Sequence, residues 1–205
     1  MRCPHSAGIR STLALLVISS TFTVGASSTS AQSRSTWSAS GTLGLAAPVG
    51  GWRSDLDPGT EYRIAFARRR ENSRWALEAE LTRHAFTFAD DALAARQDGS
   101  ARGTIRQTSL GLGLRYALLE RSGLSTWVSG GVAAHSVRTS LWRESPVRDP
   151  VLVLLRDEYV PGLSAGFGIA LGPFRLQPVA EVRVRFVALR ERPLVSVPIA
   201  VGLRF

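Results

Sequence analysis

Hydrophobic and polar residues alternate along most of the chain beyond its first thirty-odd positions. The clearest stretch covers residues 194–205, in which every second residue from Val195 to Phe205 is apolar. The positions between them hold small or polar residues, among them Gly202 and Arg204. Side chains of a β-strand point alternately to opposite faces, so this stretch predicts a strand with one wholly apolar face.

The same alternation predicts seven further strands before this one. Each is close to the length of about 9–11 residues that a tilted membrane-spanning strand requires. The expected strands cover residues 36–47, 60–69, 75–84, 109–118, 124–136, 159–171 and 174–186. Eight consecutive strands of this kind predict an all-β fold, an antiparallel up-and-down transmembrane β-barrel, in one domain over residues 32–205.

The fifth expected strand has the least regular pattern. Leu124, Val128 and Val132 share a face, which directs Trp127 inward. A β-bulge at the Gly130–Gly131 pair would change the register at this point. The alternation alone therefore leaves the register of this strand open.

Short and long connections alternate between the expected strands. Three short turns are interleaved with four longer loops: the turns are at 71–73, 119–123 and 172–173, and the loops are near 48–59, 89–104, 140–157 and 188–193. Outer-membrane barrels have short periplasmic turns and long outer loops, so we expect both termini on the periplasmic side. The apolar run at 151–155 either extends a strand above the membrane or contacts a partner.

A soluble sandwich or barrel is the rival fold. It would turn the apolar faces inward and the polar faces to solvent. The polar faces of the expected strands are rich in small residues, including Gly111, Gly113, Gly166 and Gly168. Small residues suit a narrow and crowded lumen better than a solvated exterior, so the pattern favours the membrane barrel.

The first residues have the composition of a secretory signal peptide. Arg2 and Arg10 precede a short apolar run at 13–24, and small residues follow as far as Ala31. The run is too short for a transmembrane helix. We expect a signal peptide over residues 1–31 with cleavage after Ala31, or alternatively after Ala26.

The chain is similar to the small eight-stranded outer-membrane barrels typified by the transmembrane domain of OmpA and by OmpX. The resemblance covers residues 36–205 and rests on the strand count, the alternation of loops and the final Phe205. It implies a monomer in the outer membrane, surrounded by lipid and lipopolysaccharide and inserted by the barrel-assembly machinery. In that family this machinery reads the terminal strand, and Leu203 and Phe205 match its signal.

Charged residues fall on the expected inward faces of the strands. The lumen of an eight-stranded barrel is only wide enough for side chains to fill it, so charges inside it must pair. The expected network comprises Arg63, Glu78, Glu80, Arg115, Glu181, Arg183, Arg185 and Arg204. It predicts a lumen plugged by Arg–Glu pairs. A narrow channel through the same groups is the alternative, and the excess of arginine would make it prefer anions.

The chain is basic, with a formal net charge of +9, and all of its basic residues are arginine. For an exported protein an anionic membrane surface is a nearer partner than nucleic acid, which we do not expect it to bind. Guanidinium groups bind phosphate through paired hydrogen bonds. Arginines of the expected outer region are therefore candidates for contacts with lipopolysaccharide phosphates, namely Arg138, Arg143, Arg148 and Arg156.

The sequence gives little support for catalysis. Lipid A deacylases and palmitoyltransferases share this fold, and the deacylases place a His and a Ser two residues apart on one strand face. Beyond the signal peptide only His84, expected near the outer rim, and His135 remain, and Ser136 would point away from its neighbour. Two separated histidines also lack the spacing of metal ligands.

We therefore expect no enzyme activity, no metal and no cofactor. A structural role in envelope integrity, or a role in surface interaction, is the function that the sequence favours. A lipid A-modifying enzyme is the least supported alternative.

Overall fold

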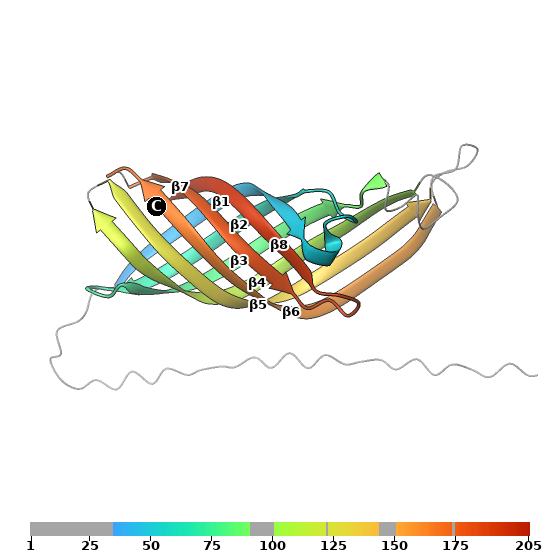
Figure 1. Cartoon of the computed structure of the whole chain (residues 1–205). Coiled ribbons are helices and arrows are strands. Elements are labelled where there is room, and N and C mark those ends of the chain that lie inside the picture. Colours follow the sequence, from blue (N-terminus) through green and yellow to red (C-terminus); the bar gives the residue numbers. More distant parts are fainter. Residues whose placement is uncertain (1–34, 91–100, 122, 144–150, 174) are drawn as a thin grey trace, which may run out of the picture. The chain divides into compact units, whose positions relative to one another are not determined.

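The computed structural model describes residues 35–90, 101–121, 123–143, 151–173 and 175–205. Here eight antiparallel strands form a closed barrel in which each strand pairs with its neighbour in sequence and β8 pairs with β1 (Figure 1). The strands are β1 (Ser35–Val49), β2 (Gly59–Arg70), β3 (Trp75–Thr87), β4 (Ala101–Arg121), β5 (Leu124–Arg143), β6 (Val151–Leu171), β7 (Gln177–Val187) and β8 (Leu194–Arg204). The eight-stranded up-and-down barrel predicted from the alternation is confirmed.

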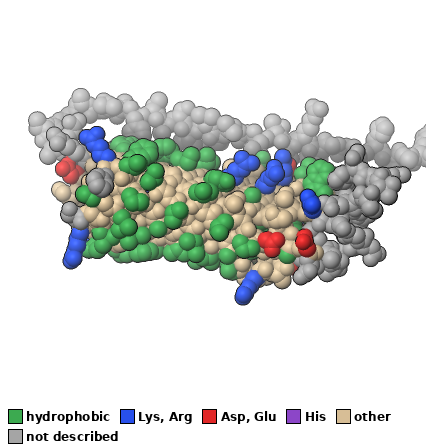
Figure 2. Space-filling model, turned by 90° about the horizontal axis from the view of Figure 1, so that it is seen from above, with side chains coloured by type: hydrophobic (Ala, Val, Ile, Leu, Met, Phe, Trp, Pro, Cys, Tyr) green, Lys and Arg blue, Asp and Glu red, His purple; other side chains and the backbone are tan. Residues whose placement is uncertain are grey.

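The apolar positions of the strands point outward. Leu43, Ile64, Leu112 and Val201 are each more than half exposed, and polar residues between such positions, for example Thr82, are buried. In Figure 2, hydrophobic side chains spread over the middle of the visible face and charged side chains gather toward the ends. A soluble barrel would have the opposite orientation, so the structure favours the membrane form.

Helices contribute almost nothing to this fold. The one helix within the described ranges is a single 3₁₀ turn, η1 (Gly50–Trp52), which follows β1. Within those ranges, no helix combines the length and the apolar character needed to cross a membrane.

The two ends of the barrel differ. Short turns join β2 to β3, β4 to β5 and β6 to β7, and they lie at the end that also holds Phe205 (Figure 1). Asn72 and Gly123 adopt the left-handed backbone region in two of these turns, with φ of 64° and 84°. We call this end the turn end and the opposite one the loop end.

Three neighbouring strands are much longer than the others. β4, β5 and β6 have 21, 20 and 21 residues, whereas the other five have 11 to 15. Their loop-end halves extend past the rest of the barrel (Figure 1), and we call this part the projecting sheet. The loops predicted at 89–104 and 140–157 were therefore too long, and the run at 151–155 extends β6. Beyond the membrane both faces of a strand meet water, so the alternation that marks a membrane strand is lost.

The structure decides the register of β5, which the alternation left open. Gly130 and Gly131 pair without a shift with both β4 and β6, so no bulge lies there. One shift in the pairing of β5 lies opposite β4, between Ala117 and Leu119, and another lies at Leu141 and Trp142, where β5 pairs with β6. Trp127 points into the barrel, as its position in the alternation predicted, and is 2% exposed.

We expect the packing of Trp127 on Gly168 to contribute measurably to stability. Gly168 lies opposite Trp127 on β6, and a Cβ at this position would overlap the indole ring. Gly168→Ala should therefore lower the free energy of unfolding by about 1–3 kcal/mol, measured by urea titration in lipid vesicles. Gly41→Ala is the matched control, because a Cβ there has no other atom within 4 Å. Equal losses in both variants would contradict this packing.

Candidate functional site

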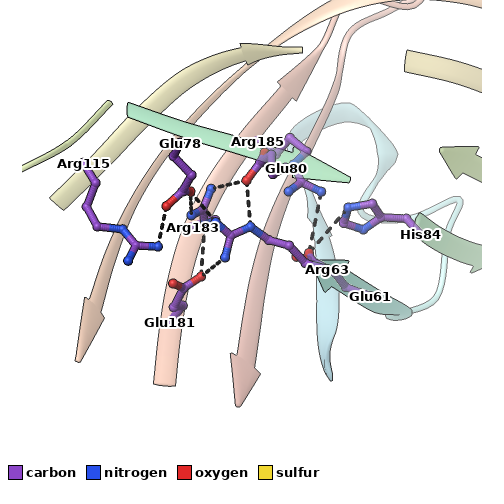
Figure 3. A network of polar contacts seen from close by, with 9 residues as sticks. All are labelled: Glu61, Arg63, Glu78, Glu80, His84, Arg115, Glu181, Arg183 and Arg185. Carbon is purple, nitrogen blue, oxygen red and sulfur yellow. Dashed lines mark hydrogen bonds and ion pairs between the residues drawn. The ribbon is translucent and has the colours of Figure 1, made fainter. Parts of the chain in front are cut away.

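Arg63 of β2 lies at the centre of a charged cluster in the middle of the lumen (Figure 3). Its Nε donates to Glu80 Oε2 at 2.7 Å and its Nη1 donates to Glu181 Oε2 at 2.7 Å. Its Nη2 donates to Glu78. The side chain is 1% exposed, so one guanidinium neutralises parts of three carboxylates out of contact with water.

Arg183 of β7 contacts the same three glutamates. It donates to Glu80 at 2.9 Å, to Glu78 at 3.1 Å and to Glu181 at 3.4 Å. Arg115 of β4 pairs with the second carboxylate oxygen of Glu78. Each carboxylate therefore faces at least two guanidiniums, which offsets the cost of removing it from water.

The alternation of the strands explains why these groups meet. Glu78 and Glu80 are two residues apart on β3 and share its inward face. Arg63 lies on the neighbouring strand, where its direct partner is Thr82. Glu181 lies on β7, which is three strands away from β2 when the count runs through β1 and β8. It reaches Arg63 because the lumen of an eight-stranded barrel is narrow.

A second group of polar residues lies beside this cluster and includes a carboxylate that the sequence analysis missed. Glu61 is 1% exposed, and its Oε2 lies 3.7 Å from Arg185 Nη1 and 3.5 Å from His84 Nε2. The signal was available, because Glu61 stands two residues before Arg63 and so shares its inward face.

The charges of the lumen network therefore balance among the described residues. Its arginines are Arg63, Arg115, Arg183 and Arg185, and its glutamates are Glu61, Glu78, Glu80 and Glu181. The excess of positive charge on which an anion preference was based is absent from this part of the lumen.

Arg204 lies apart from the network at the turn end. It donates to Gln177 Oε1 at 2.7 Å and to Ser125 Oγ at 3.3 Å, and it stacks over the ring of Trp127 at 5.3 Å. No carboxylate of a described residue forms an ion pair with it. Of the eight charges predicted to form one network, Arg204 is the one that the structure places elsewhere, because its strand position puts it at the rim.

The two histidines of the described part of the chain are buried inside the barrel. His84 is 1% exposed and stacks on Phe86 of the plug, with ring centroids 6.0 Å apart, so it lies inside the barrel close to the loop end of β3. His135 Nδ1 contacts Gln107, and Ser136 points outward on the opposite face. Ser109, the cross-strand partner of His135, makes no hydrogen bond through its hydroxyl with any described group.

An apolar cluster, which we call the plug, fills the lumen toward the loop end. It is formed by Ala46, Trp52, Leu56, Phe86, Phe88, Ile105, Val137, Val160, Val187 and Leu194, all at most 8% exposed. Arg192 holds the segment after η1 against it, since its guanidinium lies 4.0 Å from the ring centre of Trp52 and pairs with Asp55. The plug separates the charged network from the loop end.

Two of the arginines proposed to contact lipopolysaccharide have acidic partners. Arg138 binds Asp157 through two hydrogen bonds of 2.8 and 3.1 Å, and these bonds lower the pKa of the exposed Asp157. Arg156 pairs with Glu158 at 2.6 Å and with Glu191 at 2.5 Å. The side chain of Arg143 and the whole of Arg148 lie outside the described residues.

The proposed assembly residues lie on the outside of β8 and just after it. Leu203 and Phe205 are 47% and 68% exposed, and the backbone of Phe205 pairs with that of Ala39 on β1. Their side chains therefore face the membrane region, and the backbone pairing closes the barrel at the turn end.

Comparison with solved structures identifies the fold. Neisserial surface protein A has a TM-score of 0.58 and 13% identity, over 83% of this chain and 97% of that protein. The chain folds as a small eight-stranded outer-membrane β-barrel. The outer-membrane barrel Ail of Yersinia pestis, in complex with the heparin analogue sucrose octasulfate, has a TM-score of 0.47 and 13% identity over 83% of this chain and 97% of Ail. The N-terminal barrel of Pseudomonas aeruginosa OprF has a TM-score of 0.45 and 12% identity over 84% of this chain and all of that domain. No family model and no curated protein matches the sequence.

We expect this barrel to depend strongly on Arg63. Arg63→Gln would leave three buried carboxylates short of a partner, and the free energy of unfolding should fall by about 3–5 kcal/mol. Urea titration in vesicles, followed by heat-modifiable migration on gels, measures the loss. Arg121→Gln is the control, because Arg121 is an exposed residue at the end of β4. A loss in Arg63→Gln no larger than in the control would show that the network does not stabilise the fold.

Proposed function

We propose that this protein is an outer-membrane barrel that is closed to solutes and serves envelope integrity and interaction at the cell surface. The filled lumen is the observation that carries the proposal. A solute would have to pass the Arg–Glu network and then the plug, which contains Trp52, Phe86 and Phe88. Opening such a path would separate buried ion pairs and expose apolar side chains to water.

The outward apolar face and the fold support a location in the outer membrane, with lipid and lipopolysaccharide as neighbours. Closure of β8 on β1 leaves no unpaired strand within the barrel wall, which favours a monomer. Assembly by the barrel-assembly machinery through Leu203 and Phe205 is part of the proposal. Residues 1–34 lie outside the described part, so the signal peptide and its cleavage after Ala31 stay predictions.

The projecting sheet is the surface that would meet a partner. Pairing of β6 with β7 begins at Gly162, so β6 has no β7 partner between Val151 and Pro161. Leu154 and Leu155 are exposed on this part of the strand. A strand edge with free backbone groups and apolar side chains can bind an extended segment of another protein.

Arg83 and Arg106 are better placed than Arg138 or Arg156 to bind lipopolysaccharide phosphates. Both point outward from neighbouring strands, on the loop-end side of the exposed Leu81 and Leu110. Neither forms an ion pair with a carboxylate of a described residue. Their guanidiniums are therefore available to phosphate groups at the membrane surface, and Arg143 and Arg148 remain candidates beside them.

The closed lumen makes a direct prediction for electrical recordings. The purified barrel in planar lipid bilayers should show no steady conductance above that of the lipid, because the plug and the network close the lumen in series. A known pore in the same bilayer serves as the positive control. Reproducible openings would instead support the narrow channel, and their ion selectivity would test the charge balance of the network.

We expect loss of the outward arginines to weaken lipopolysaccharide binding. The double variant Arg83→Gln and Arg106→Gln should retain several-fold less lipopolysaccharide on purification, since each lost charge-assisted contact weakens binding. The amount of lipid A phosphate per barrel measures this. Arg138→Gln is the matched control, because Arg138 already pairs with Asp157. Equal retention by all variants would contradict the assignment.

A further inference from the structure

A cavity of about 210 Å³ opens inside the barrel at the turn end. The residues that line it include Arg74, Arg115, Ser125, Trp127 and Arg204. It lies at the opposite end of the lumen from the plug, and it is separate from the projecting sheet and from the outward arginines.

The charges around this cavity are not balanced. Among the described residues, its lining contains Arg69, Arg74, Arg115 and Arg204 but only one acidic residue, Glu120. Glu120 pairs with Arg69, and Arg115 pairs with Glu78 of the lumen network. Arg74 and Arg204 form no ion pair with a described carboxylate, so about two positive charges remain uncompensated.

Two buried N–H groups of the lining also lack an acceptor. Trp127 is 2% exposed and Arg115 is 7% exposed. Neither Trp127 Nε1 nor Arg115 Nε donates a hydrogen bond to any described group. Buried donors normally have acceptors, so these two N–H groups add to the unbalanced positive character of the wall around the cavity.

The ring of Trp127 holds two of the cations in place. The guanidiniums of Arg115 and Arg204 lie 4.7 and 5.3 Å from its centre. Such stacking fixes the plane of a guanidinium while leaving its N–H groups free at the edge. Arg204 is held further by Gln177 and Ser125, which are neutral and leave its charge uncompensated.

We propose that this cavity is a binding site for a phosphate group. A phosphate or phosphate monoester carries about two negative charges near neutral pH, which matches the two uncompensated arginines, whereas a carboxylate carries one. Its oxygens can accept from the guanidiniums of Arg74 and Arg204, which both line the cavity. The group can come from a soluble phosphate or from the headgroup of a neighbouring lipid.

The indole N–H of Trp127 provides the readout. The barrel, labelled with ¹⁵N and held in a maltoside detergent free of phosphate, is titrated with inorganic phosphate at constant ionic strength set by chloride. The indole cross-peak that is absent from Trp127→Phe should shift and saturate with phosphate. Arg204→Gln should raise the phosphate concentration at half-saturation about tenfold, as for loss of one charge-assisted contact. Arg74→Gln is the second variant, in case Arg204→Gln does not fold.

Arg190→Gln is the matched control, because it removes the same charge from an exposed loop at the opposite end. It should leave the titration unchanged. No shift of the Trp127 peak in the wild-type protein, or equal half-saturation in all three arginine variants, would overturn the site.

A second arm distinguishes the source of the phosphate group. If a lipid headgroup occupies the site, the Trp127 peak in phospholipid nanodiscs is already displaced and does not move when phosphate is added. If the site takes a soluble phosphate, the peak in nanodiscs starts at its detergent position and moves on titration. A peak that stays at its detergent position throughout would contradict the proposal.

Discussion

Pairing of buried charge in a narrow lumen is the constraint on which the rest of this structure depends. The outward face meets lipid, so the strands cannot gain stability by hiding that face from water, and the interior must hold the polar half of every strand. Arg63 and Arg183 each contact the same three glutamates, which come from β3 and β7. These contacts connect distant parts of the barrel wall. Each charge must have a partner, because an isolated charge at this depth would cost several kcal/mol.

The lumen is divided along its length into regions of different chemistry. At the turn end Arg204 stacks on Trp127 beside an open cavity. In the middle equal numbers of arginine and glutamate pair, and toward the loop end the lumen is filled by the apolar plug. The middle region is neutral and the turn end is positive. The arrangement suits a barrel that binds at its ends better than one that conducts along its axis.

Most of the charged cluster could be predicted, because the face on which a side chain lies depends only on its position in the alternation. That rule correctly placed Arg63, Glu78 and Glu181 in the lumen. The same rule applies to Glu61, and its omission, together with the inclusion of Arg204, gave the predicted network an excess of arginine. The rule contains no depth along the barrel axis, so it could not separate Arg204 at the rim from the network, or show that His84 contacts Phe86 of the plug.

The sequence by itself determined the strand count, the closing strand and the inward or outward direction of the side chains, since these follow from a local period of two residues. Only the tertiary structure decided which charges meet, as with Arg63 and Glu181, which are 118 residues apart. It also decided the length of β4–β6 and the register of β5. These depend on the stagger between strands and on cross-strand pairing, which bring together residues that no local pattern connects.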